Sequence, residues 1–313
     1  MDFRTSFAEA DTLVAPLSPT AISSKPLAAT GADTVAANTL TLQNFPKNRL
    51  TLQDGTHLFV RDWGVGAPIV FLAGWCLTTD SWGYQMPDMV ENGFRCIAYD
   101  RRGHGKSDDP GGGYDYDTLA DDLAELLEQR NLDGVTLVAH SMASGEVIRY
   151  MTRHRGKRVA KIAMLGPTAP CLMQTANNPS GISREVFDQV RQELRYDFQG
   201  WIARNAAPFI APSTCQTTIA WFTNQMGQTS MQAVLDCNRT IIESDFREEL
   251  KLIDVPILVI HGSADASAPL ELTGKCVVEI ARNAKLKVYA NAPHSLFATH
   301  ARQVNADLLA FAS

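Results

Sequence analysis

The sequence predicts an α/β fold in which a mostly parallel central sheet is flanked by helices and carries a helical cap insertion. Strand-like and helix-like segments alternate from Asn48 to the end of the chain. Most strand-like segments are apolar throughout, as strands are when helices cover both faces of a parallel sheet. The alternation is interrupted at about residues 170–250, where helix-like segments occur without a convincing strand. We expect this insertion to cover the carboxyl edge of the sheet, where ligands bind in open α/β folds.

Local patterns predict the individual elements. Residues 49–52 and 57–63 are two strands joined by a turn at Asp54-Gly55, a dipeptide that favours hairpins. The helix at residues 116–131 repeats leucine at three- and four-residue spacing. The remaining strands are expected at residues 68–72, 95–99, 161–165, 256–260 and 285–289, with one more starting at Val135. The remaining helices are expected at residues 82–91, from Glu146 onward, and at residues 304–311.

The first 45 residues differ from the rest in composition. They are rich in Ala, Thr, Ser and Pro with little amphipathic period, so residues 1–45 are predicted to be an N-terminal extension, either flexible or lying as an arm on the surface. Residues 46–313 form the domain that carries the cap insertion. The extension is a poor secretion signal, because Pro16 and Pro19 break its apolar stretch and acidic residues precede it. We therefore predict a cytoplasmic protein, with export through this segment as the alternative.

Composition and charge argue against several classes of protein. The net charge of -6 at pH 7, without a basic stripe, argues against a nucleic-acid partner. No run approaches the roughly 18 apolar residues that a membrane span needs. The 6 cysteines are scattered and the 7 histidines lack metal-ligand spacing, so we expect reduced thiols and no metal. Partners are then expected to be small molecules, with a homo-oligomer left open.

The most informative segment surrounds Ser141. A run of strand formers from Val135 leads into small residues around this serine, and a helix pattern begins at Glu146. This layout is typical of a nucleophile elbow, in which a tight turn exposes a serine hydroxyl above a sheet. The helix N-terminus behind it favours the negative charge that develops when an acyl carbonyl is attacked. Taken alone, the stretch Ala139-His-Ser-Met-Ala143 also fits a serine that caps a helix.

A serine nucleophile needs a histidine base and an acid that orients the base. Asp265 lies just beyond the strand at residues 256–260, and His294 just beyond the strand at residues 285–289. Residues of the right types therefore occur in the order Ser, Asp, His, each after its own strand, which favours a catalytic triad. The alternative roles are a helix cap for Asp265 and a structural turn histidine for His294. Alternative acids are Asp100, Asp245 and Asp254.

Two backbone N–H groups are expected to bind the negative oxygen of the reaction. One belongs to Met142, directly after the serine. The other is expected in the loop Ala73-Gly-Trp-Cys76, where Gly74 allows a close approach and the N–H of Trp75 can face the oxyanion. The alternative for Trp75 is a core aromatic residue on that loop.

Several stretches resemble the α/β-hydrolase superfamily, and within it the cofactor-free haloperoxidase-like esterases and perhydrolases. The matching stretches are residues 100–107, 113–122, 141–147, 246–256, 289–294 and 305–311. The similarity covers roughly residues 48–313. It implies Ser141 as nucleophile, Asp265 as acid, His294 as base, and Trp75 and Met142 as oxyanion donors. It also implies that neither a metal nor a haem cofactor takes part.

Three features depart from that family or from its neighbours. Cys76 stands where members usually carry a proline, which the family ties to hydrogen peroxide as acyl acceptor, so this departure speaks against perhydrolysis. Ala139 and Ala143 replace the elbow glycines and are expected to narrow the space beside the nucleophile. Epoxide hydrolases and haloalkane dehalogenases share the fold but place an aspartate where Ser141 stands.

Together these residues predict a serine hydrolase that cleaves a small carboxylic ester or lactone and releases the acyl group to water. The same triad leaves open amide hydrolysis, C–C bond hydrolysis and perhydrolysis. The replaced elbow glycines leave open a ligand-binding protein with little turnover. The predicted substrate-binding residues are Trp201, Phe209, Trp221, Phe222 and Leu296, with Ile210 and Met226 as further apolar candidates in the insertion.

Overall fold

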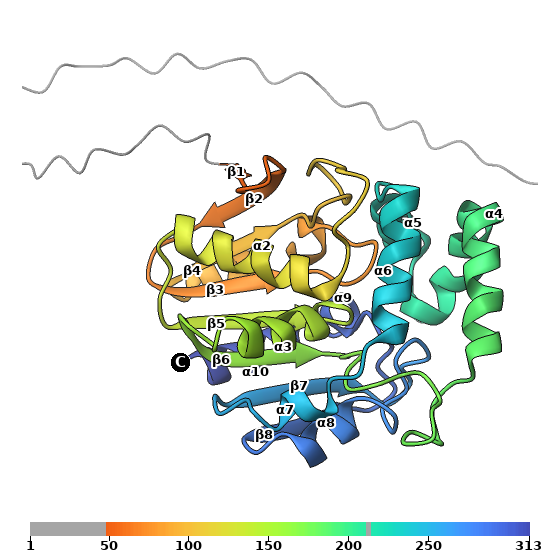
Figure 1. Ribbon diagram of the computed structural model, residues 1–313. Coiled ribbons are helices and arrows are strands. Elements are labelled where there is room, and N and C mark those ends of the chain that lie inside the picture. Colours follow the sequence, from red (N-terminus) through yellow and green to blue (C-terminus); the bar gives the residue numbers. More distant parts are fainter. Residues whose placement is uncertain (1–47, 211–213) are drawn as a thin grey trace, which may run out of the picture. The chain divides into compact units, whose positions relative to one another are not determined.

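The central sheet of the computed structural model has eight strands in the order β1-β2-β4-β3-β5-β6-β7-β8 (Figure 1). The structure describes residues 48–210 and 214–313, so the predicted N-terminal extension lies outside the described residues. β2 pairs antiparallel with β1 and with β4, and all other neighbouring strands are parallel, which confirms the predicted sheet. The strands are β1 (Arg49–Thr51), β2 (His57–Trp63), β3 (Ala67–Leu72), β4 (Phe94–Tyr99), β5 (Val135–His140), β6 (Val159–Leu165), β7 (Ile257–Gly262) and β8 (Ala284–Tyr289).

Helices cover both faces of this sheet. Neighbouring residues of β3 enter different hydrophobic cores, with Val70 in one and Phe71 in the other, because successive side chains of a strand point to opposite faces. Helices α2, α3 and α8 pack into the first core, and α1, α9 and α10 into the second. These helices are α1 (Met86–Glu91), α2 (Tyr116–Gln129), α3 (Ala143–Arg153), α8 (Gly274–Ile280), α9 (Leu296–Thr299) and α10 (Ala301–Ala312).

The prediction of a single helix at residues 82–91 is wrong in one respect, because the structure has two shorter helices in this region. A short 3-10 helix, η1 (Thr79–Trp82), ends at Gly83, and α1 begins only at Met86. The physical reason is Pro87, which lacks a backbone N–H and is tolerated only in the first turn of a helix. The new helix therefore begins at Met86, with Pro87 in its first turn.

The insertion folds as a helical cap. It contains α4 (Arg184–Ile210), α5 (Gln216–Met226), α6 (Met231–Glu243) and the short α7 (Arg247–Leu250). In Figure 1, α4, α5 and α6 stand beside the ends toward which the parallel strands point. Asp197 has non-helical backbone angles within α4, so this helix is kinked. No helix in the described part of the chain is long and apolar enough to cross a membrane.

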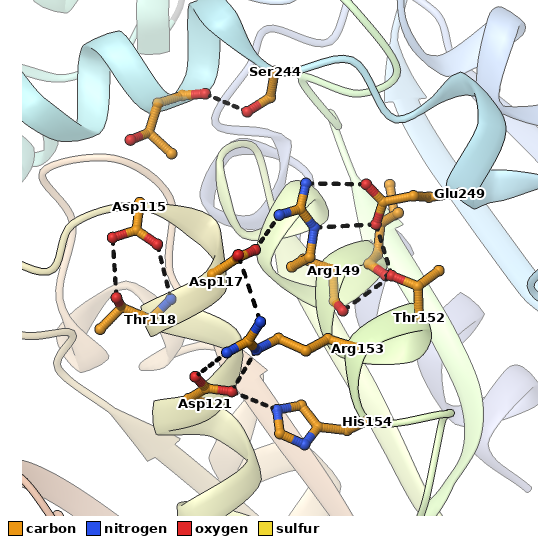
Figure 2. A network of polar contacts seen from close by, with 12 residues as sticks. Asp115, Asp117, Thr118, Asp121, Arg149, Thr152, Arg153, His154, Ser244 and Glu249 are labelled. Atoms are coloured by element: carbon orange, nitrogen blue, oxygen red, sulfur yellow. Dashed lines mark hydrogen bonds and ion pairs between the residues drawn. The ribbon is translucent and has the colours of Figure 1, made fainter.

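Ion pairs tie α2, α3 and α7 together on the outside of the first core (Figure 2). Arg153 donates to both carboxylate oxygens of Asp121, at 2.7 and 2.8 Å, and Nε2 of His154 lies 2.7 Å from the same carboxylate. Arg149 donates to both oxygens of Glu249, at 3.1 and 3.0 Å. We call this group of side chains the surface network.

Candidate active site

Ser141 occupies the turn between β5 and α3. Its φ angle is 55°, in the left-handed region that residues with a side chain rarely adopt. The N–H of Ser141 donates to the carbonyl of Leu165 at 3.0 Å, and Ser144 donates through its N–H and its hydroxyl to the carbonyl of Ser141 at 3.0 and 2.7 Å. A strained residue that its surroundings hold in place is typical of functional sites. The N-cap of α3 is Met142, so Ser141 does not have the alternative role of a helix cap.

The small residues around the elbow differ in whether a side chain fits at their position. Ala139 and Ala143 are fully buried on its two sides. The position that requires glycine comes later, at Gly145, where an added Cβ would collide with the ring of Tyr116 and lie 2.7 Å from the ring of Phe246. Replacement of the usual elbow glycines by alanine therefore leaves the strand, turn and helix intact.

His294 joins Ser141 to Asp265. Its Nε2 lies 2.8 Å from Oγ of Ser141, and its Nδ1 lies 2.6 Å from Oδ2 of Asp265. A carboxylate only accepts hydrogen bonds, so Nδ1 carries the ring proton and Nε2 faces the serine hydroxyl as an acceptor. All three residues are buried. The structure thus brings together the three residues that the sequence predicts for a triad.

The surroundings of Asp265 favour its ionised form. Its Oδ1 accepts the N–H groups of Ser267 and Ala268, at 2.9 and 2.8 Å, and Nε2 of His261 lies 3.2 Å from its Oδ2. Burial raises the pKa of Asp265, but His294, His261 and the backbone donor outweigh it and hold the pKa well below its ordinary value. Asp265 therefore caps a turn with one oxygen and orients His294 with the other.

The three alternative acids lie elsewhere. Asp100 accepts two backbone N–H groups, at 2.7 and 2.9 Å, and anchors its own loop. Asp245 pairs with Arg247, and Asp254 has an exposed side chain. Only Asp265 among the candidate acids contacts His294.

The loop that carries Trp75 approaches the elbow closely. An added Cβ at Gly74 would lie 2.6 Å from Nδ1 of His140 and 3.2 Å from Cβ of Ser141, so only glycine permits this approach. The N–H of Trp75 donates to no acceptor among the residues that the structure describes. The N–H of Met142 comes before the first hydrogen bonds of α3, since the first N–H groups of a helix have no partner within it. Both groups are therefore available to a negatively charged oxygen.

A buried ion pair between Arg101 and Glu146, which sequence reasoning missed, contacts the loop that carries Trp75. Arg101 donates to the carbonyl of Ala73 at 2.9 Å and to Oε2 of Glu146 through Nε and Nη2, at 3.0 and 2.7 Å. The hydroxyl of Tyr99 donates to the other oxygen of Glu146. The side chains of Arg101 and Glu146 are 3% and 0% exposed, so the pair links the loop to the first turn of α3 without contact with water. The only signal in the sequence is a glutamate among the small residues of the elbow helix.

Comparisons with known proteins agree with this geometry. The profile of the alpha/beta hydrolase fold matches residues 67–225. A non-heme chloroperoxidase of Streptomyces lividans is 39% identical over 272 residues, which cover 84% of this chain and 98% of that protein. The chain belongs to the α/β-hydrolase family.

Two further relatives narrow the branch of this α/β-hydrolase family. A bifunctional esterase/perhydrolase of Acinetobacter calcoaceticus is 36% identical over 272 residues, with 84% of this chain and 98% of the relative covered. The structure of an esterase from Exiguobacterium antarcticum aligns with a TM-score of 0.82 at 29% identity, and covers 85% of this chain and 98% of that chain. These likenesses confirm the haloperoxidase-like branch and identify the hydrolase as an enzyme.

A cavity of about 330 Å³ lies between the triad of this hydrolase and its cap. Ser141, His294 and Trp75 line it, together with two of the predicted substrate-binding residues, Trp201 and Phe209. Met226 lines it as well. No Asp, Glu, Lys or Arg within residues 48–210 and 214–313 contributes to its wall. The remaining wall is mostly aliphatic and includes Leu172, Ile182, Val186, Val190, Ile202, Ile241 and Ile242.

Trp221, Phe222 and Leu296 do not line the cavity, which corrects the prediction for these three residues. Phe222 and Leu296 are fully buried, and the ring of Phe222 lies 5.7 Å from that of Phe297 in the second core. Trp221 packs edge to face against the ring of Tyr84, with 6.0 Å between the ring centroids. Ile210 is likewise buried away from the cavity. The apolar face of a cap helix covers both core and cavity, so its sequence pattern does not separate the two.

No set of three or more His, Cys, Asp and Glu side chains in the described chain is arranged to hold a metal ion. All six cysteines are free thiols, and four of them are buried. Burial raises the pKa of the Cys96 thiol to about 12.

Proposed function

We propose that the protein is a serine hydrolase that cleaves a small, neutral carboxylic ester or lactone through Ser141, His294 and Asp265. The observation that carries this proposal is the continuous path from Oγ of Ser141 through His294 to Asp265, with distances of 2.8 and 2.6 Å, in the wall of a largely apolar cavity. Without a charged side chain among its described lining residues, the cavity favours a substrate that is itself uncharged.

The proposed reaction uses each residue in a separate role. His294 takes the proton of Ser141 as the serine attacks the carbonyl, and then returns it to the leaving alcohol. The N–H groups of Trp75 and Met142 stabilise the oxyanion. Asp265 holds the tautomer of His294 and stabilises the imidazolium that forms. Water, activated by His294, then hydrolyses the acyl-enzyme.

The relatives named chloroperoxidase and perhydrolase favour a second candidate, in which hydrogen peroxide replaces water as acyl acceptor. Cys76 argues against hydrogen peroxide as the acyl acceptor. The φ angle of Cys76 is 57°, whereas a proline ring locks φ near -65°. The loop beside Trp75 therefore has a backbone that the proline of the family cannot adopt. This geometry supports water as the main acceptor.

We also propose a cytoplasmic location. The support is the absence of disulfides among six cysteines, because disulfides are rare where thiols are kept reduced.

The proposed function is tested by hydrolysis of p-nitrophenyl acetate, butyrate and octanoate. We expect the wild type to hydrolyse these esters without peroxide, with the short chains preferred because the cavity of about 330 Å³ is at the lower end of the range for ligand sites. Ser141→Ala should lower kcat/KM by at least about 10³-fold, since the nucleophile is lost.

A matched control is Ser244→Ala. Ser244 donates to the carbonyl of Thr240 at the end of α6, outside the cavity, and its loss should leave kcat/KM near the wild-type value (Figure 2). Retention of full activity by Ser141→Ala would sink the proposal. Activity that requires peroxide would favour the second candidate.

A further inference from the structure

Asn238 places one polar side chain in the aliphatic part of the cavity. It lies on α6 and lines the cavity together with Ile241 and Ile242, three and four residues further along, so these side chains share one face of the helix. Asn238 is only 9% exposed. Asn238 is therefore nine-tenths removed from water and forms part of the wall of the cavity.

The carboxamide oxygen of Asn238 has no partner in the described protein. Oδ1 accepts no hydrogen bond from any residue that the structure describes. Asn205, another asparagine in the cavity wall, differs, because its Nδ2 donates to the carbonyl of Trp201 at 2.8 Å. A buried polar group without a partner destabilises the folded protein, so its presence calls for a ligand that supplies the partner.

Asn238 stands at a fixed offset from the reacting atoms. Nε1 of Trp75 donates to the carbonyl of Val234 at 3.1 Å, which ties the oxyanion loop to the first turn of α6. Val234 lies four residues before Asn238, so the backbone of Asn238 is about one helical turn, roughly 5 Å, further along the helix. A substrate whose carbonyl lies at Trp75 and Ser141 therefore shares one cavity with Asn238.

We propose that Asn238 is a specificity-determining residue that recognises a hydroxyl or secondary amide group on the substrate. The preferred substrate is then a neutral ester or lactone whose cavity-filling part is apolar except for one hydroxyl or amide group, which forms a hydrogen bond with the carboxamide of Asn238. This inference rests on the proposed ester hydrolysis. An all-carbon analogue enters the same cavity but leaves the carboxamide without a polar partner, and a site built to bond a polar group discriminates strongly against the analogue that lacks it.

The test compares methyl esters of equal chain length, in which only the acyl part fills the cavity. The polar esters are methyl N-acetylglycinate and methyl 3-hydroxypentanoate, and the apolar reference is methyl pentanoate. We expect the wild type to have a higher kcat/KM for at least one of the two polar esters than for methyl pentanoate. The better polar ester is the one with the higher kcat/KM. In Asn238→Leu the ratio of that ester to pentanoate should fall by about 10- to 100-fold, the usual effect of one buried hydrogen bond. Asn238→Ala, which adds no bulk, should lower the ratio in the same direction.

Asn92→Leu is the matched control, because Asn92 lies outside the cavity and its amide already donates to the carbonyl of Asp88. The ratio should then change by less than about threefold, within the scatter of single contacts. The melting temperature of Asn238→Leu should equal or exceed that of the wild type, because an unpaired polar group is removed.

Two results would overturn the inference. One is an unchanged ratio for both polar esters in Asn238→Leu and Asn238→Ala. The other is a lowered melting temperature in both variants, which would show that the protein itself uses the carboxamide. Failure of the proposed function is distinguishable, because it appears as methyl pentanoate hydrolysis that survives in Ser141→Ala. If Ser141→Ala loses this hydrolysis while the ratio is unchanged in both Asn238 variants, the role of Asn238 is contradicted and the proposed function stands.

Discussion

Two aspartate–histidine pairs of almost equal length lie in different regions of this hydrolase. Asp265 and His294 are 2.6 Å apart in the site, with side chains 0% and 3% exposed. Asp121 and His154 are 2.7 Å apart in the surface network, with side chains 41% and 29% exposed (Figure 2). The two pairs therefore differ in their surroundings and not in the distance between their partners.

The difference between the pairs is what each histidine faces and how much water reaches it. The second nitrogen of His294 faces the hydroxyl of Ser141, whereas the ring of His154 stacks on Tyr150 at 5.3 Å. Water and counter-ions screen the surface pair, while burial strengthens every electrostatic contact of the site. The same contrast separates Arg101–Glu146 beneath the oxyanion loop from Arg153–Asp121 in the surface network. Burial, and the Ser141 hydroxyl on the second nitrogen of His294, distinguish the pair in the site from the pair at the surface.

Loss of the carboxylate should reduce activity far more in the buried pair than in the surface pair. Asp265→Asn should lower kcat/KM for p-nitrophenyl butyrate by about 10⁴-fold, because an amide stabilises the wrong tautomer of the histidine. The equivalent change at the surface, Asp121→Asn, should leave kcat/KM within about twofold, since surface changes away from the site are nearly neutral. Equal losses in the two variants would contradict the assignment of Asp265.

A second effect concerns the stability of the buried ion pair. Glu146→Gln leaves the Arg101 cation buried without its counter-charge, and should lower the free energy of unfolding by about 3–5 kcal/mol in urea titrations. It should also lower kcat, because Arg101 holds the carbonyl of Ala73 next to the oxyanion loop. The double variant Arg101→Met/Glu146→Leu should regain most of the stability without regaining kcat. A fully stable Glu146→Gln protein would show that the pair is dispensable.

A third effect is the loss of stability in mild acid. Burial and the nearby Arg101 lower the pKa of His104 to about 3, and burial and the nearby His294 lower the pKa of His140 well below its ordinary value. In the unfolded chain both histidines take up protons near pH 6.5, so acid favours unfolding from that pH downward.

Each of these histidines should remove about 1.4 kcal/mol of stability per pH unit below about 6.5. The free energies of unfolding of the wild type at pH 6.5 and at pH 5, from urea titrations, should therefore differ by roughly 3 kcal/mol from the two together. His104→Gln should show about half of this difference. A free energy of unfolding that does not change between the two pH values would mean that neither histidine stays neutral in the folded protein.

The smallest effect belongs to the surface network. Arg153→Gln removes the two contacts to Asp121, yet the free energy of unfolding should change by less than about 0.5 kcal/mol, because both side chains are more than a third exposed. Addition of salt should reduce even this difference. A loss as large as that of Glu146→Gln would erase the distinction between the two regions.

The sequence predicted the sheet and the candidate triad because both depend on short-range patterns. Buried strands are recognised by their short apolar runs. Ser141 follows directly on β5, and Asp265 and His294 lie in the loops after β7 and β8. The pocket was harder, since an amphipathic helix shows which face is apolar but not whether it meets core or cavity, as Phe222 and Phe209 illustrate. Glu146 and Asn238 were missed because a polar residue on a helix is normally exposed. Their burial depends on contacts with segments distant in the sequence.

Labelling by a fluorophosphonate, followed by mass spectrometry of the digested protein, tests directly whether Ser141 is the nucleophile. If Ser141 is the nucleophile activated by His294, the wild type takes up one equivalent rapidly, and the label is found on the peptide that contains Ser141. Ser141→Ala should remain unlabelled, and Asp265→Asn should react far more slowly. Absence of label in the folded wild type, or label on another residue, would contradict the account.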